Sequence, residues 1–105
     1  MVEIELPAKE YRFLKSVYDN MSNYLMRVED HVDTVVLCIF DERFKEFRLD
    51  FRSTIVRKGT VDKEAYNDTG LRLISIYQKY VQPVEDELLE NTQQLNLKAV
   101  QEEDS

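Results

Sequence analysis

The sequence predicts an all-α protein, a single antiparallel bundle of three long helices, on the strength of three observations. Apolar residues from Tyr11 to Ile39 recur at steps of three and four, a helical spacing close to that of a coiled coil. A second stripe with this spacing runs from Val32 to Ile55. The chain has only two Gly and two Pro, which sheets and tight turns use often. At 105 residues, 43% of them apolar, the chain is expected to form one domain over residues 1–105.

The first helix is expected to begin at Pro7, after an extended lead-in at residues 1–6, and to end near Glu29. Proline suits the first helical position because the N–H that it lacks would have no partner there. Three residues beside the main stripe widen the apolar arc to about 160°, more than one neighbouring helix covers. These residues are the candidate protein interface: Phe13, Val17 and Tyr24.

The second helix is expected between a break at residues 30–33 and Lys58, just before Gly59. Asp30 or Asp33 could cap it. Every second residue between Phe47 and Ile55 could also lie on one face of a strand, so a strand is the alternative for this segment. The helix is favoured because five apolar residues then form one narrow stripe. They are Phe40, Phe44, Phe47, Phe51 and Ile55.

The third helix is expected to begin at Thr60 or Asp62, or after a break at residues 67–70 with Asp68 or Thr69 as the cap. Pro83 removes a backbone donor, so the helix should kink there, and the segment beyond could form a fourth helix. Residues 93–105 are expected to be a partly frayed, acidic C-terminal tail.

Charge is distributed unevenly along the chain. The net charge is -7, and residues 83–105 hold one Lys against seven acidic residues, which argues against binding of the whole molecule to nucleic acid or anionic lipid. Glu85 and its acidic neighbours could complement a helix N-terminus, dock to a basic partner, or fold back on Arg48 and Arg52. Basic residues of the second helix could track a phosphate backbone, although interleaved acids favour internal ion pairs. This candidate nucleic-acid face is Lys45, Arg48, Arg52, Arg57 and Lys58.

Residues suited to catalysis or metal binding are scarce. His31, the only histidine, lies beside Asp30 and Asp33, as a solvated loop residue would. Cys38, the only cysteine, lies in an apolar run, which predicts a buried, reduced thiol and excludes an internal disulfide or a zinc site built on cysteine pairs. The chain has no phosphate-binding glycine loop, nucleophile elbow or paired-histidine zinc motif. We therefore expect no enzymatic activity, no cofactor and no metal.

These observations predict a non-enzymatic protein-interaction module, an adaptor, regulator or subunit of a complex. Its expected partner is another protein or a second copy, and a homodimer is favoured because the wide arc of the first helix needs a cover. The alternative is a nucleic-acid-associated regulator that uses the basic face of the second helix. The longest apolar run, residues 35–40, is too short to cross a membrane, and the N-terminus lacks a signal-peptide pattern, so we expect a cytoplasmic protein without membrane association.

Overall fold

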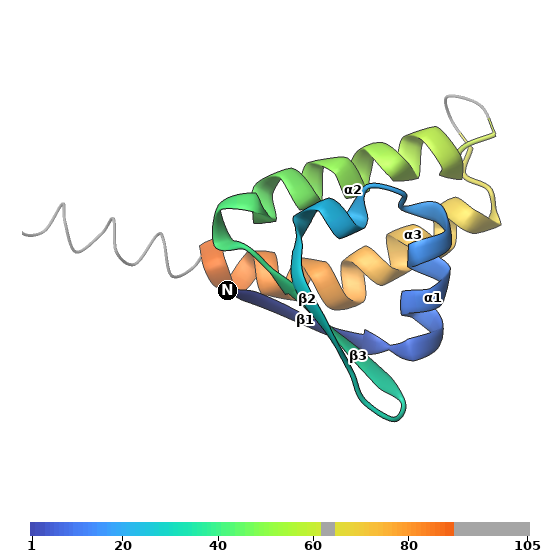
Figure 1. The fold of residues 1–105 in the computed structure, drawn as a ribbon. Helices are drawn as coiled ribbons and strands as arrows, with labels where there is room; N and C mark the ends of the chain where they lie inside the picture. Colours follow the sequence, from blue (N-terminus) through green and yellow to red (C-terminus); the bar gives the residue numbers. More distant parts are fainter. Residues whose placement is uncertain (62–64, 90–105) are drawn as a thin grey trace, which may run out of the picture.

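The protein has an α+β fold, which contradicts the predicted all-α bundle. The computed structural model describes residues 1–61 and 65–89. Over these residues a three-stranded antiparallel sheet, in the strand order β1-β3-β2, packs against helices (Figure 1). The first 40 residues, expected to lie mainly in two helices, supply all three strands.

Strand β1 (Val2–Pro7) replaces the predicted lead-in. Its side chains alternate: Val2, Ile4 and Leu6 are buried, while Glu3 and Glu5 are exposed. This period of two is the signature of a strand with one face on a core. The strand pairs with β3 along its whole length, from Val2 opposite Ile39 to Pro7 opposite Thr34.

Strands β2 (Leu25–Asp30) and β3 (Thr34–Ile39) form a hairpin where the predicted first and second helices would have met. The run of β-branched and apolar residues in β3 suits a strand buried within a sheet. Val32, a member of both predicted helical stripes, lies in the hairpin turn and is 96% exposed. The regular spacing through this region therefore belongs to two short strands and a turn, and not to the ends of two helices.

Helix α1 (Ala8–Val17) ends far short of the predicted Glu29. The chain leaves helical geometry at Tyr18, and a 3-10 turn, η1 (Met21–Tyr24), then leads into β2. The side chains of Tyr18 and Met21 are both buried in the core at this corner. Burial of these two side chains therefore accompanies the change of direction.

Helix α2 (Phe44–Gly59) follows a short 3-10 turn, η2 (Asp41–Arg43). The helical interpretation of the Phe47–Ile55 region is confirmed, although the helix begins later than predicted. Its buried stripe contacts the core through four apolar side chains spaced three and four residues apart. They are Phe44, Phe47, Phe51 and Ile55.

Helix α3 (Asp68–Ile76) begins within residues 67–70, where a break was one of the predicted alternatives, but Asn67 is the cap in place of Asp68 or Thr69. Its side-chain oxygen accepts a hydrogen bond from the Gly70 N–H at 2.8 Å. A π-helical turn, η3 (Tyr77–Val81), continues α3, and residues 82–89 remain helical. The wide turn lies just before Pro83, whose ring and missing N–H disfavour normal α-helical hydrogen bonding. The predicted kink is therefore a π turn, and no separate fourth helix begins there.

The two glycines of the chain face each other where α2 and α3 approach most closely. A Cβ placed on Gly70 would lie 2.1 Å from the Gly59 carbonyl oxygen, and one on Gly59 would lie 2.5 Å from the Gly70 Cα. The same Gly59 oxygen accepts a hydrogen bond from the Asn67 N–H at 2.9 Å. Backbone packs directly on backbone here, so neither position has room for a side chain.

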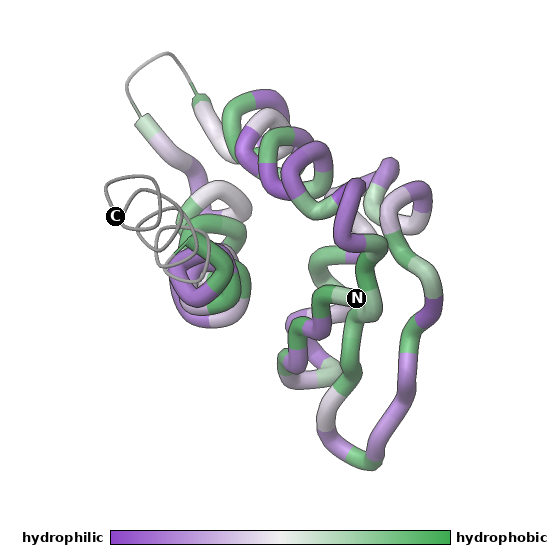
Figure 2. Tube along the Cα trace, turned by 90° about the vertical axis from the view of Figure 1, so that its left-hand side faces the viewer, coloured by the Kyte–Doolittle hydropathy of each residue, from purple (hydrophilic) through white to green (hydrophobic). Residues whose placement is uncertain are grey.

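The core lies between one face of the sheet and the helices. In Figure 2 the strands and the α3 run lie on opposite sides, with α2 above them. The contacts place η3 against β1 and α2 against α3 and η1. Over the described residues, no helix is long and apolar enough to cross a membrane. The predicted tail at residues 93–105 lies outside the described residues.

Candidate functional site

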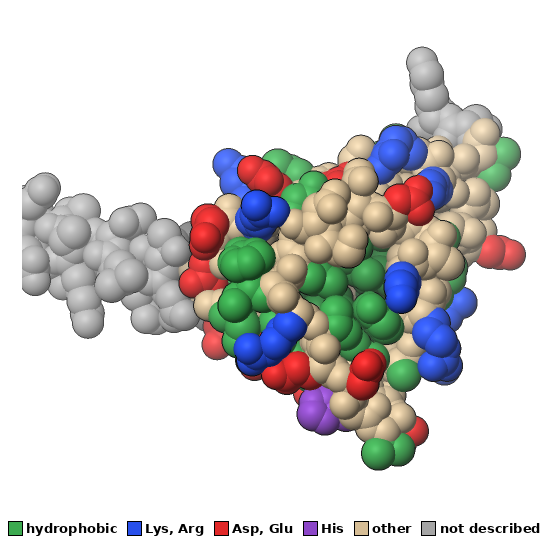
Figure 3. Space-filling model, viewed as in Figure 1, with side chains coloured by type: hydrophobic (Ala, Val, Ile, Leu, Met, Phe, Trp, Pro, Cys, Tyr) green, Lys and Arg blue, Asp and Glu red, His purple; other side chains and the backbone are tan. Residues whose placement is uncertain are grey.

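The outer edge of β2 borders an apolar groove, which we call the β2 groove. It has a volume of about 410 Å³ and lies between α1, η1 and β2. Figure 3 shows hydrophobic side chains gathered in the middle of this face of the molecule, in the region where Figure 1 places the space between β2 and α1. The groove is lined by Tyr11, Lys15, Tyr18, Asp19, Met21, Ser22, Leu25 and Val28.

The floor of the β2 groove is part of the core, whereas its walls are half-exposed. Tyr18 and Met21 are each 2% exposed, while Tyr11, Leu25 and Val28 are intermediate. Lys15 and Asp19 place one charge of each sign at the rim. Apolar walls with a mixed polar rim are typical of a surface that docks another protein.

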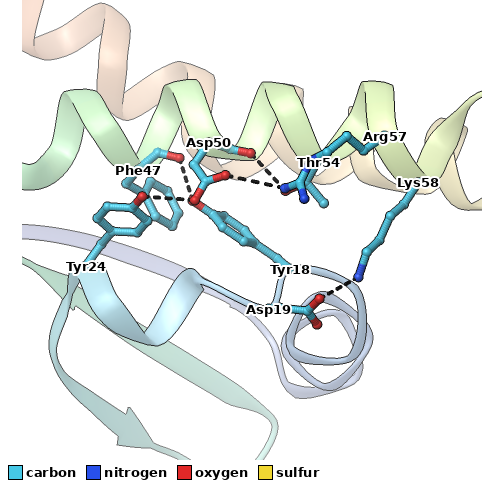
Figure 4. A network of polar contacts seen from close by, with 8 residues as sticks. All are labelled: Tyr18, Asp19, Tyr24, Phe47, Asp50, Thr54, Arg57 and Lys58. Atoms are coloured by element: carbon cyan, nitrogen blue, oxygen red, sulfur yellow. Dashed lines mark hydrogen bonds and ion pairs between the residues drawn. The ribbon is translucent and has the colours of Figure 1, made fainter.

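A network of polar contacts fixes the floor of the groove to α2 (Figure 4). The Tyr18 hydroxyl donates to the Phe47 carbonyl at 2.8 Å, and the Tyr24 hydroxyl donates to Asp50 Oδ2 at 2.9 Å. Arg57 lies 3.6 Å from the other Asp50 oxygen. Burial of the phenol, and then the negative charge of Asp50, raise the pKa of Tyr18, so this hydroxyl stays protonated as a donor. The groove is therefore built on a rigid base.

Strand β2 is an edge strand whose outer backbone groups are available for pairing. It is the last strand in the sheet order, and among the described residues no further strand pairs with it. The His31 N–H bonds to the Thr34 carbonyl, and bonded positions alternate along an antiparallel pair. Val28 and Asp30 therefore direct their backbone N–H and C=O groups away from β3, toward the open edge.

Charged side chains mark the outer face of β2. Arg27 Nε lies 3.0 Å from Glu29 Oε1, and both side chains are substantially exposed. The carboxylate of Glu29 raises the pKa of Arg27. A bulge interrupts the pairing with β3 between Leu25 and Arg27. Bulges and charges restrict which strands can add to an edge.

The three residues of the predicted protein interface lie on two elements, Phe13 and Val17 on α1 and Tyr24 in η1. Phe13 is half-buried, with the Arg72 guanidinium 4.0 Å from its ring centroid. Val17 is half-buried against the core. Tyr24 packs on Phe47 and bonds to Asp50. All three side chains are therefore half-buried and contact other parts of the chain.

The predicted nucleic-acid face is largely occupied by internal ion pairs. Arg48 and Arg52 both contact Glu85, which is 7% exposed, so the structure matches the predicted alternative in which this acidic segment folds back. Arg57 pairs with Asp50, and Lys58 lies 2.8 Å from Asp19. Lys45 is exposed on α2.

The two residues considered for catalysis or metal binding, His31 and Cys38, do not line the β2 groove. His31 is exposed beside the hairpin turn, and Cys38 is a buried free thiol on β3, opposite Glu3 of β1 and Arg27 of β2. Among the described residues, no group of three or more His, Cys, Asp or Glu side chains is placed to hold a metal ion.

Comparisons with protein-family models, with curated proteins and with solved structures find no match for this chain. Val28 and Tyr11 were not predicted as groove residues, because both keep the helical spacing of the apolar stripe from Tyr11 to Ile39. The available signal was the strand-like run that follows Leu25, which would have put Val28 on a sheet.

Proposed function

We propose that this protein is a non-enzymatic interaction module that pairs with a second copy of itself through the outer edge of β2 and the β2 groove. The single observation that carries the proposal is the charge pattern of the open edge. Strand addition to a free edge supplies backbone hydrogen bonds, and side chains then determine which strand is accepted.

Antiparallel pairing centred on Val28 gives hydrogen-bond partners to the outward backbone groups of β2 in both copies. A two-fold axis at Val28 places it opposite Val28 of the partner subunit, and its outward N–H and C=O can exchange both hydrogen bonds there. In this register Arg27 lies opposite Glu29 of the partner subunit, and Glu29 opposite Arg27 of the partner subunit. Both cross-strand pairs are attractive, which favours the edge of this chain as its own partner.

The β2 groove supports the same arrangement. Val28 and Leu25 are only half-buried on the helix side of the sheet, beside Tyr11 of α1. A second sheet joined at β2 would bring the Val28 side chain of the partner subunit to the mouth of the groove and remove this apolar surface from water. Two-fold pairing is the commonest way in which a chain covers such a surface.

A cytoplasmic setting belongs to this proposal, supported by the buried free thiol of Cys38. The nucleic-acid alternative is less well supported, because four of its five basic residues contact acidic side chains of the same chain.

A charge-swap experiment tests the proposed pairing. Arg27→Glu and Glu29→Arg alone should each weaken the dimer about tenfold, because each places like charges opposite each other twice. The double variant should restore the dimer. A mixture of the two single variants should form a heterodimer, since acidic and basic edges then face each other. Light scattering and analytical ultracentrifugation at tens of micromolar measure all four cases.

The mixture of single variants distinguishes an effect of charge pairing between two chains from an effect of losing the Arg27–Glu29 ion pair within one chain. Both single variants lose the internal Arg27–Glu29 pair, and mixing cannot restore it. Lys45→Glu, on exposed α2, is the matched control and should leave the dimer unchanged. A monomeric parent, or a dimer that none of these substitutions affects, would show that β2 is not the interface.

A further inference from the structure

A second pocket lies between the first turn of α1 and the α3–η3 run. We call it the lysine pocket. Its volume is about 520 Å³, within the range of small-molecule sites. It shares no lining residue with the β2 groove. The lining residues are Pro7, Lys9, Glu10, Leu71, Arg72, Ser75, Ile76, Lys79 and Tyr80.

The charge of the lysine pocket is opposite to that of the whole chain. Three cationic side chains line it against one carboxylate, although the chain carries a net charge of -7. Arg72 is held in place, because its guanidinium lies 3.0 Å from Glu10 and 4.0 Å from the Phe13 ring centroid. Lys9 and Lys79 are exposed and form no ion pair with any described residue. These two ammonium groups are available to an anion.

The backbone on both sides of the lysine pocket suits an anion as well. Helix α1 begins here, and no side chain caps its N-terminus, so the positive end of its dipole adds to the lysines. On the other side, Lys79 and Tyr80 belong to the π turn η3. Such turns change the direction of the following side chains and occur often at functional sites.

The remaining lining indicates the class of anion. Ser75 and Tyr80 can donate hydrogen bonds from their hydroxyls. Leu71 and Ile76, with Pro7, give the pocket an apolar wall. Cations and hydroxyl donors suit phosphate oxygens, and an apolar wall suits the organic group that the phosphate carries.

We propose that the lysine pocket binds a small organic phosphate, a phosphate monoester with an apolar or aromatic body, held by Lys9 and Lys79. The anion lies against the first turn of α1, and the body of the ligand packs on the wall formed by Leu71 and Ile76. This site is independent of the β2 edge, so either proposal can fail without the other.

Titration with phenyl phosphate, followed by amide chemical shifts and by calorimetry, tests this site. Shifts should concentrate at residues 9–10 and 72–80. Lys9→Gln and Lys79→Gln should each weaken binding about tenfold, because each removes one charge-assisted hydrogen bond. Lys45→Gln removes the same charge from exposed α2 and should leave binding unchanged. Inorganic phosphate should bind more weakly than phenyl phosphate.

Three outcomes would overturn the proposal. The first is no binding of phenyl phosphate at millimolar concentration. The second is an equal loss in the Lys45→Gln variant, which would indicate general charge attraction. The third is equal binding of inorganic phosphate, which would show that the apolar wall contributes nothing to the ligand. Circular dichroism of each variant checks that the fold is retained.

Discussion

The two edge strands of the sheet have equal lengths and opposite environments. Both β1 and β2 have six residues and pair antiparallel with β3. Strand β1 buries every second side chain and lies on the side where η3 packs, whereas β2 has no fully buried residue and contains a bulge. One face of β1 is therefore enclosed in the core, whereas every side chain of β2 stays at least partly exposed.

This difference assigns separate roles to the two edges. An edge strand with one fully buried face contributes to stability, and an edge strand that is only partly buried, with charges arranged along it, is suited to pairing. Substitutions near β1 should therefore affect folding of the single chain, whereas substitutions in β2 should affect association. Three pairs of substitutions and one pH dependence would test that division.

Glu85→Ala should cost about 3 kcal/mol of unfolding free energy, because a buried ion pair would lose one partner. Glu85 accepts hydrogen bonds from Arg48, Arg52 and Tyr77. It therefore connects the helical residues that follow η3 to α2. The Nε of Arg48 is already buried without a hydrogen-bond partner in the described part of the chain. Urea unfolding measures the loss.

Glu87→Ala is the matched control for this variant, since Glu87 is exposed on the same helical segment. It should change stability by less than about 0.5 kcal/mol. Equal losses of unfolding free energy in the two variants would mean that the contacts of Glu85 with α2 and η3 add nothing to stability.

Ile4→Ala in β1 should cost about 2–5 kcal/mol, because Ile4 is 1% exposed and its truncation leaves a cavity. Val28→Ala in β2 should cost the single chain about 1 kcal/mol or less, since this half-buried side chain lies at the mouth of the groove. Unfolding at a concentration low enough to keep the chain monomeric compares them. If Val28→Ala and Ile4→Ala lowered the unfolding free energy equally, the two edge strands would not differ in their contribution to stability.

Stability should fall above about pH 10, through two buried tyrosines of the core. Burial raises the pKa of Tyr18, at the groove, and of Tyr77, beside Glu85. Because the unfolded chain releases these protons first, the folded state loses stability as the pH rises past the ordinary tyrosine value. The slope is at most about 1.4 kcal/mol per pH unit for each tyrosine.

Tyr18→Phe and Tyr77→Phe should each make this decline shallower, and thermal unfolding between neutral and alkaline pH measures it. A decline that neither substitution changes would place the responsible group elsewhere. Below the ordinary tyrosine value, both phenols are protonated in both states and contribute no pH dependence.

The sequence predicted α2 because its pattern depends on one helix alone. Phe47, Phe51 and Ile55 would also share one face of a strand, but the step of three from Phe44 to Phe47 keeps one face only in a helix. The strands were missed because Val28, Val32, Val35 and Ile39 keep helical spacing by coincidence across a turn. The alternation of Val2, Ile4 and Leu6 was visible, but a strand at a chain end is identified only with a partner strand.

Neither candidate site could be predicted from spacing. The β2 groove depends on Tyr11 of α1 and Val28 of β2, which meet only because the chain reverses at η1. The lysine pocket combines Lys9 with Lys79, from opposite ends of the described chain. Side chains brought together by topology leave no periodic pattern, so the fold has to be known first.

The contact between Gly59 and Gly70 has a consequence for how relatives of this chain can be found. A side chain at either position meets the backbone of the other, so no change at one position can compensate for a change at the other. Sequence changes that alter most of the surface should therefore keep Gly59 and Gly70. Asn67 should be kept as well, because it forms hydrogen bonds with both glycines. We therefore expect relatives of this chain to keep both glycines and this asparagine at the same separations, even where the rest of the surface has changed.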